Sequence, residues 1–144
     1  MRRIYISLLL CTSLFAQIPT PEMNRKLTEL AKTLTSISFE GQKPVTVEGT
    51  VGTLVWPEGA KGVLVVKTAK GDQYAFSTAR VPDMAKQGFT RFAVKPGTTL
   101  KIMGVLAPGN GRIGSDWIAA RADTVDQTDG KRLFDRAKLP DGSK

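Results

Sequence analysis

Apolar and polar residues alternate with a period of two along several stretches between residues 43 and 134. Such alternation predicts β-strands that bury one face. The first stretch, KPVTVEGTVGTLVW, contains glycines at positions 49 and 52, which indicate a bulge or the strong coiling of a barrel corner. The pattern places one set of residues on the first face of this strand: Val45, Val47, Val51 and Val55. The opposite face carries Thr46, Glu48, Thr50 and Leu54.

The next two strand-like runs are GVLVVKTA, which begins apolar on both faces, and QYAFSTA. Lys70, Gly71 and Asp72 lie between them, so a hairpin is predicted. A short helix is expected from Pro82 to Gln87, ended by Gly88.

The fourth strand is predicted from Thr99 to Leu106, and a fifth from Trp117 to Val125. The segment predicted as the fifth strand could instead be a helix, because Ser115 could cap a helix that continues through Ala122. We favour the strand, since five strands close a small barrel whereas four leave an open edge. The turn Asp129–Gly130 then leads into a short segment that ends at Phe134.

The resulting order is strand, strand, strand, helix, strand, strand. This is the order of the oligonucleotide/oligosaccharide-binding (OB) barrel. We therefore expect an all-β fold, a closed five-stranded OB-like barrel with one or two short helices, preceded by an N-terminal amphipathic helix.

The predicted N-terminal helix lies within residues 20–37. Thr20 is a suitable cap, Pro21 suits the first helical position, and Glu22 complements the positive helix end. Apolar residues then recur at spacings of three and four: Met23, Leu27, Leu30, Leu34 and Ile37. We expect this face to pack against the barrel or to cover one of its ends. The alternatives are a helix that binds a partner and a helix that lies on a membrane surface.

The N-terminus has the pattern of a secretory signal peptide. Arg2 and Arg3 precede an apolar run from Ile4 to Phe15, and Ala16 offers a small residue for cleavage. A bilayer-spanning helix needs about 20 apolar residues, so a membrane anchor is not expected. Cys11 suggests a lipoprotein, but bulky Leu10 before it argues against a lipid anchor. We predict export to the periplasm or beyond.

The predicted organisation is a signal peptide (1–16), an arm with the amphipathic helix (17–42), the barrel domain (43–134) and a flexible polar tail (135–144). Cleavage removes two of the 21 basic residues and none of the 13 acidic ones, which leaves a net charge of +6. This moderate charge is compatible with anionic partners, but the basic residues are spread from Arg25 to Lys144 without a dense block, so solubility is the favoured explanation. The one cysteine is lost with the signal peptide, so no disulfide is expected.

Three segments resemble a family of small exported bacterial proteins, the domain of unknown function 6152 family. They are KPVTVEGTVGTLVW, GFTRFAVKPGTTLKIMGVLAPGNGRIGSDWIAARADTV and DGKRLF. The resemblance implies a periplasmic or secreted all-β domain without an assigned activity. In that family a histidine usually follows the tryptophan after an asparagine and a proline. Here Trp56 precedes Pro57, Glu58 and Gly59, and the chain has no histidine.

Catalytic and metal-binding motifs are weak in this chain. Gly109–Gly114 matches the G-x-G-x-x-G spacing, but the 30 residues that follow are too few for a dinucleotide-binding sheet. The carboxylates of Asp123, Asp126 and Asp129 lack the spacing and the glutamate of a calcium loop. Without histidine there is no catalytic triad. We expect no metal, no cofactor and no enzymatic activity, and keep a hydrolase that uses carboxylates alone as an alternative.

A binding surface is the remaining hypothesis. OB-type barrels bind ligands across strands two and three, between the loops that follow strands one and four. The candidate ligand-binding residues in these positions are Trp56, Lys61, Lys67, Tyr74, Asn110 and Arg112. Aromatic rings beside basic groups can stack on bases or sugars while neutralising phosphates. Tyr74 and Phe76 share one face of a strand, however, and core packing is the favoured explanation for them.

The sequence thus predicts a non-enzymatic binding or accessory module of the cell envelope, with an unknown ligand. A weak binder of anionic polymers through Lys61, Lys67 and Arg112 is the alternative binding hypothesis. Expected partners are an envelope protein, a glycan or an anionic lipid head group. Nucleic acid is not expected, because an exported domain rarely meets it.

Overall fold

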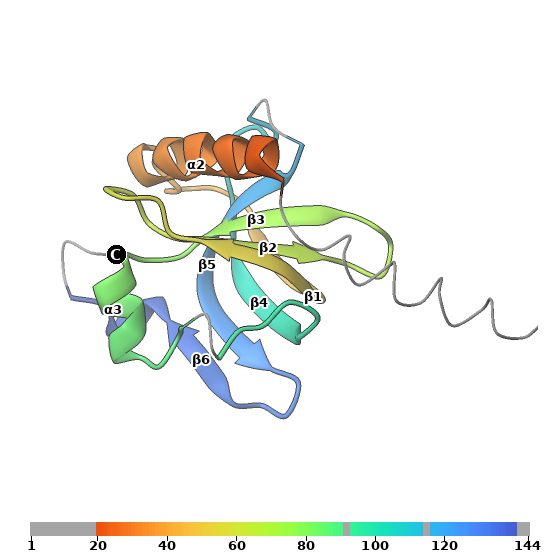
Figure 1. Cartoon of the computed structure of the whole chain (residues 1–144), viewed down its shortest axis with the longest axis vertical. Helices are drawn as coiled ribbons and strands as arrows, with labels where there is room; N and C mark the ends of the chain where they lie inside the picture. Colours follow the sequence, from red (N-terminus) through yellow and green to blue (C-terminus); the bar gives the residue numbers. More distant parts are fainter. Residues whose placement is uncertain (1–19, 91–92, 114–115, 141–144) are drawn as a thin grey trace, which may run out of the picture.

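Five strands close into a barrel, and a long helix lies on its outer wall (Figure 1). The computed structural model describes residues 20–90, 93–113 and 116–140. The elements, in chain order, are α2 (Pro21–Ser36), β1 (Pro44–Val55), β2 (Val63–Lys67), β3 (Gln73–Ser77), α3 (Val81–Lys86), β4 (Thr99–Leu106), β5 (Ile118–Gln127), β6 (Arg132–Asp135) and the 3-10 helix η1 (Arg136–Lys138).

The strand pairing confirms the predicted OB-like order. β1 pairs antiparallel with β2 and β4, β2 pairs with β3, and β4 pairs with β5. The barrel closes where β3 and β5 run parallel, from the pair Tyr74 and Ile118 to the pair Ser77 and Arg121. β6 then extends the sheet along the second half of β5. The helix between β3 and β4 is α3, close to its expected position.

The fifth run is a strand, as predicted, rather than a helix. β5 pairs with β4, β3 and β6, so its backbone groups are used on both sides. Ser115, the cap of the alternative helix, lies outside the described residues.

The predicted faces of the first strand are wrong beyond its middle. The register of β1 against β2 shifts between Val51 and Thr53, where Gly52 lies. Side chains alternate with a period of two, so one extra residue exchanges the two faces. Leu54 therefore packs against the barrel interior, and Val55 packs against the cluster under the helix.

The apolar residues form two separate clusters. One fills the barrel and includes Leu64, Val66 and Phe76. The other lies between α2 and the outer face of the barrel, where Leu27, Leu30, Ala31 and Leu34 meet residues such as Val63, Val65, Ala75 and Ala119. This arrangement explains why β2 is apolar on both faces: one face points into the barrel and the other lies under α2.

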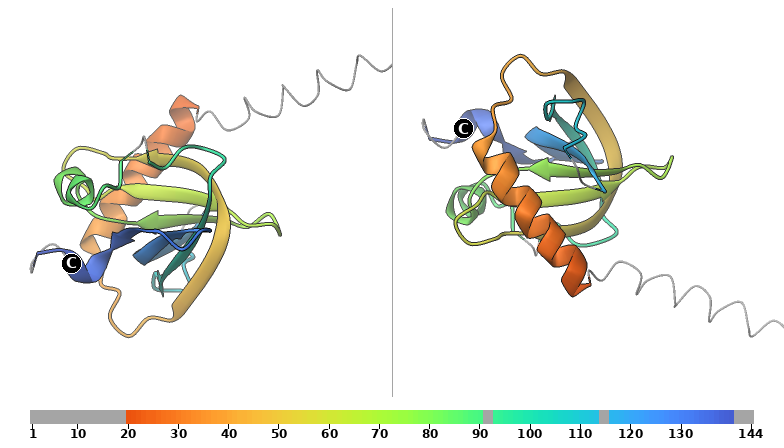
Figure 2. Two further views of the ribbon diagram at one scale, coloured as in Figure 1. Left: turned by 90° about the horizontal axis from the view of Figure 1, so that it is seen from below. Right: turned by 90° about the horizontal axis from the view of Figure 1, so that it is seen from above.

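Helix α2 packs on the barrel wall rather than standing free. It runs obliquely across the outside of the barrel (Figure 2) and packs on residues of β2, β3 and β5. Thr20 caps it, since its hydroxyl oxygen accepts a hydrogen bond from the Met23 N–H at 3.1 Å. Met23, expected on the apolar face, lies in the first turn and remains 38% exposed. Among the helices that the structure describes, none combines the length and hydropathy required to cross a bilayer.

The structure tests the sequence expectation at the C-terminal end of the chain only. The predicted signal peptide, residues 1–16, lies outside the described residues. Residues assigned to a flexible polar tail form η1 up to Lys138, and Arg136 and Leu139 are buried. This segment packs because Leu139 joins the barrel cluster and Arg136 binds carbonyl groups of neighbouring strands.

Replacing Leu27 with alanine tests how much the packing of α2 on the barrel contributes to the stability of the protein. The Leu27 side chain, on the face of α2 that packs on the barrel, is fully buried. Leu27→Ala is therefore expected to lower the free energy of unfolding by about 3 kcal/mol. Met23→Ala, on the same helix but partly exposed, is the matched control and is expected to cost less than about 1 kcal/mol. Chemical denaturation measures both, and equal small effects would show that the helix adds little.

Two strand glycines provide a second test. A Cβ at Gly104 would overlap the carbonyl oxygen of Arg121 on the neighbouring strand, whereas a Cβ at Gly52 would meet its nearest atom at 3.7 Å. Gly104→Ala should therefore destabilise the protein by about 3 kcal/mol. Gly52→Ala should stay within about 1 kcal/mol of the parent. Thermal unfolding compares them, and a well-tolerated Gly104→Ala would contradict this close approach of β4 to β5.

Candidate functional site

The predicted aromatic site residues contribute to the barrel core. Trp56 and Tyr74 are partly buried and pack against the interior cluster. Tyr74 stacks on Phe76 with ring centroids 5.8 Å apart. The indole Nε1 of Trp56 donates a hydrogen bond to the sulfur of Met84 at 3.2 Å. These contacts account for the two rings without a ligand.

The predicted basic site residues are spread over the molecule. Lys61 and Lys67 lie at opposite ends of β2, so roughly 20 Å of extended chain separates them. Asn110 and Arg112 are exposed in the loop between β4 and β5, where Asn110 has a left-handed φ of 58°. Helix α2 covers much of the outer face of β2 and β3 between these positions. The structure therefore does not bring the six predicted residues together.

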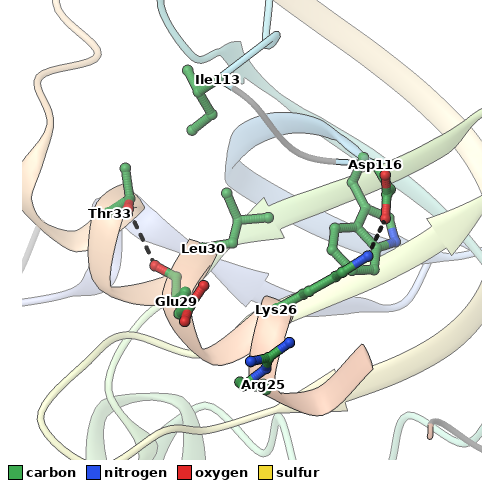
Figure 3. Close-up of a pocket in the computed structure, with 8 residues that line it drawn as sticks. Arg25, Lys26, Glu29, Leu30, Thr33, Ile113 and Asp116 are labelled. Atoms are coloured by element: carbon green, nitrogen blue, oxygen red, sulfur yellow. Dashed lines mark hydrogen bonds and ion pairs between the residues drawn. The ribbon is translucent and has the colours of Figure 1, made fainter. Parts of the chain in front are cut away.

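A pocket of about 390 Å³ lies beside the first half of α2 (Figure 3). Lys26 and Asp116 face each other there, with their charged atoms 3.1 Å apart. Glu29 is the other acid that lines the pocket.

A second pocket, of about 610 Å³, lies at the other end of α2. Its walls come from the end of the helix, the loop that follows it, and the barrel. The lining residues are Leu34, Thr35, Ile37, Ser38, Phe39, Glu40, Gly41, Gln42, Lys61, Ser77, Val105 and Arg121. We call this the cationic pocket, because Lys61 and Arg121 contribute to its wall and further arginines lie close by.

Lys61 is held at the pocket by its backbone. Its N–H donates a hydrogen bond to the hydroxyl of Thr35 at 3.1 Å, which ties the loop between β1 and β2 to the last turn of α2. Partial burial lowers the pKa of the Lys61 ammonium, and the positive charges of Arg136, Arg80 and Arg121 lower it further. The ammonium of Lys61 therefore experiences a positive local potential.

Arg121 is fixed in orientation by two contacts. Its Nε donates a hydrogen bond to a carboxylate oxygen of Asp123 at 2.9 Å. Its guanidinium lies 5.5 Å from the centre of the Phe39 ring, a favourable cation–π distance. Neither Nη group of Arg121 donates a hydrogen bond to a residue that the structure describes.

Arg136 is buried behind the pocket, with its side chain 7% exposed. Its guanidinium donates hydrogen bonds to the carbonyl oxygens of Ala122 at 2.8 Å and Thr78 at 2.7 Å, and to that of Ser77, which lines the pocket, at 3.2 Å. Asp123 lies 3.4 Å from its Nε. Burial, followed by the charge of Arg121, lowers the pKa of Arg136 to about 10 despite Asp123.

One guanidinium nitrogen of Arg136 makes no hydrogen bond within the described part of the chain. The Nη1 group of Arg136 has no hydrogen-bond partner among the residues that the structure describes. A buried donor without a partner is energetically costly.

Sequence reasoning identified Lys61 but missed Phe39, Arg121 and Arg136. One signal was present: an arginine at position 121 interrupts the apolar and small residues of WIAARADTV. A charged residue inside a strand that closes a barrel is unusual unless it has partners. For Arg136 the sequence offered no such signal, because it lies in a short polar segment.

The described residues contain no group of three or more potential metal-binding side chains. Two of the three acids in the segment compared with a calcium loop pair with arginines: Asp123 with Arg121 at 2.9 Å, and Asp126 with Arg132 at 2.8 Å. In comparisons with known proteins, no family model matches this chain, and no curated protein matches it either.

Proposed function

We propose that the protein is a non-enzymatic binding or accessory module of the cell envelope, and that it holds an anionic ligand in the cationic pocket. The observation that carries the proposal is the presence of Lys61 and Arg121 in the wall of one pocket, with Arg136 buried behind it. Positive groups with little water around them attract an anion more strongly than the same groups do on an open surface.

The proposed location in the cell envelope is supported by the sequence rather than by the pocket. The pattern of residues 1–16 is that of a signal peptide, and the segments around Trp56, Lys95–Gly97 and Asp129–Gly130 resemble the domain of unknown function 6152 family. Both point to an exported protein. We propose that the protein belongs with this family and acts outside the cytoplasm.

Binding of small anions to single-residue variants tests the pocket. Isothermal titration with inorganic phosphate, citrate and acetate should show binding of at least one of them to the parent protein. Lys61→Gln removes one charged donor from the wall, so its affinity should be about tenfold lower. Lys67→Gln, at the far end of β2, is the matched control and should bind as the parent does. Absence of binding to the parent would reject the pocket as an anion site.

The alternative function, binding of anionic polymers, depends on exposed residues instead. Lys67 and Arg112 are exposed, and charge reversal at both would remove attraction to a polyanion. We expect the double variant Lys67→Glu, Arg112→Glu to keep its affinity for small anions, because neither residue lines the cationic pocket. Retention on a heparin column at increasing salt decides the alternative: unchanged retention discards polymer binding through this surface, and a marked loss supports it.

A further inference from the structure

The cationic pocket is larger than a simple anion requires. Its volume of about 610 Å³ lies within the range of pockets that hold organic ligands, about 300–1,000 Å³. Inorganic phosphate and acetate have only a few heavy atoms and fill a small part of such a space. The volume therefore indicates a ligand that has a body beyond its charged group.

One side of the pocket is apolar. Ile37, where helix α2 ends, and Val105 of β4 both line the pocket, and both are partly buried residues that pack against the cluster under the helix. Leu34 and Phe39, buried members of the same cluster, complete this side. A ligand body that covers the exposed parts of Ile37 and Val105 removes apolar surface from water, which favours binding.

Arg121 supplies paired donors beside this apolar side. Its side chain is 29% exposed, its Nε is engaged by Asp123, and its guanidinium lies against the Phe39 ring. The two Nη groups donate to no residue that the structure describes. Two such groups of one guanidinium bind two oxygens of a single oxyanion. Because Phe39 contacts the guanidinium, the charged contact and the apolar contacts of a ligand lie next to each other.

We propose that the ligand of the cationic pocket is an amphipathic organic anion. Its oxyanion head binds the Nη groups of Arg121, and a short apolar body lies against Ile37 and Val105. This inference rests on the proposed function of the pocket as an anion site. A carboxylate and a phosphate monoester share the required head chemistry. An inorganic ion can bind Arg121 but leaves the apolar side of the pocket in contact with water.

Calorimetric titration with matched probes tests the apolar body. The probes are acetate, hexanoate, hexyl phosphate and hexanol, added to residues 17–144 of the chain at pH 7.5 and equal ionic strength. Hexanoate should bind about tenfold more tightly than acetate, because part of its four additional methylene groups leaves water. Hexanol has a similar body without the charge and should bind about tenfold more weakly than hexanoate. The tighter binder of hexanoate and hexyl phosphate identifies the head group.

Variants assign the two parts of the ligand to the two sides of the pocket. Val105→Thr places a hydroxyl on the apolar side and should weaken hexanoate about threefold, with acetate unchanged. Val81→Thr is the matched control, because Val81 is 45% exposed on α3 and does not line the pocket. Arg121→Lys keeps the charge but loses the paired donors, so it should weaken acetate and hexanoate equally. Circular dichroism and thermal unfolding verify that each variant folds.

The outcomes separate this inference from the anion site on which it rests. If acetate binds as tightly as hexanoate, or if Val105→Thr leaves the ratio of their affinities unchanged, the apolar body is wrong and the anion site stands. If hexanol binds as tightly as hexanoate, the charge contributes nothing, and both proposals fall. Both also fall if none of the four probes binds the folded parent.

Discussion

The parallel pairing of β3 with β5 is the constraint on which the rest of the structure depends. Without it the sheet would end in open edges at β3 and β6. The pairing brings Ala75 against Ala119 and Phe76 against Ala120, so small residues of β5 lie beside buried residues of β3. It also sets Arg121 opposite Ser77, whose carbonyl oxygen binds Arg136. Barrel closure and the charge of the pocket are thus consequences of one register.

Helix α2 forms a second layer on the outside of the barrel and so determines which part of the barrel surface is open to a ligand. Its apolar residues cover the outward side chains of β2 and of the neighbouring strands, the region where an OB-type barrel would present a ligand face. The helix is capped at one end by Thr20 and tied to the barrel at the other through Thr35 and Lys61. An open pocket remains where the helix ends, and its wall is basic.

The buried cation in this small protein is tolerated because its surroundings are polar on nearly every side. Removing an arginine from water is expensive unless its donors find acceptors. The middle of β5 and the end of β3 supply three carbonyl oxygens to Arg136, Asp123 supplies a carboxylate, and the Phe134 ring lies 5.6 Å from its guanidinium. Since Asp123 contacts Arg121 as well, one acid is shared between two cations, and this group of three side chains carries a net positive charge.

The sequence by itself determined the local elements: the capped helix from Thr20, the alternating strands, their OB-like order and the strand character of the segment around Ala119. These follow from side-chain periodicity and turn chemistry, which act between residues close in the chain. Only the tertiary structure decided the rest. The bulge at Gly52 exchanged the faces of Leu54 and Val55. Packing of Leu139 and Arg136 ordered a segment that reads as a polar tail. The proximity of Lys61, Arg121 and Arg136 depends on barrel closure, which pairs residues 44 positions apart, such as Ser77 and Arg121, and which no local pattern encodes.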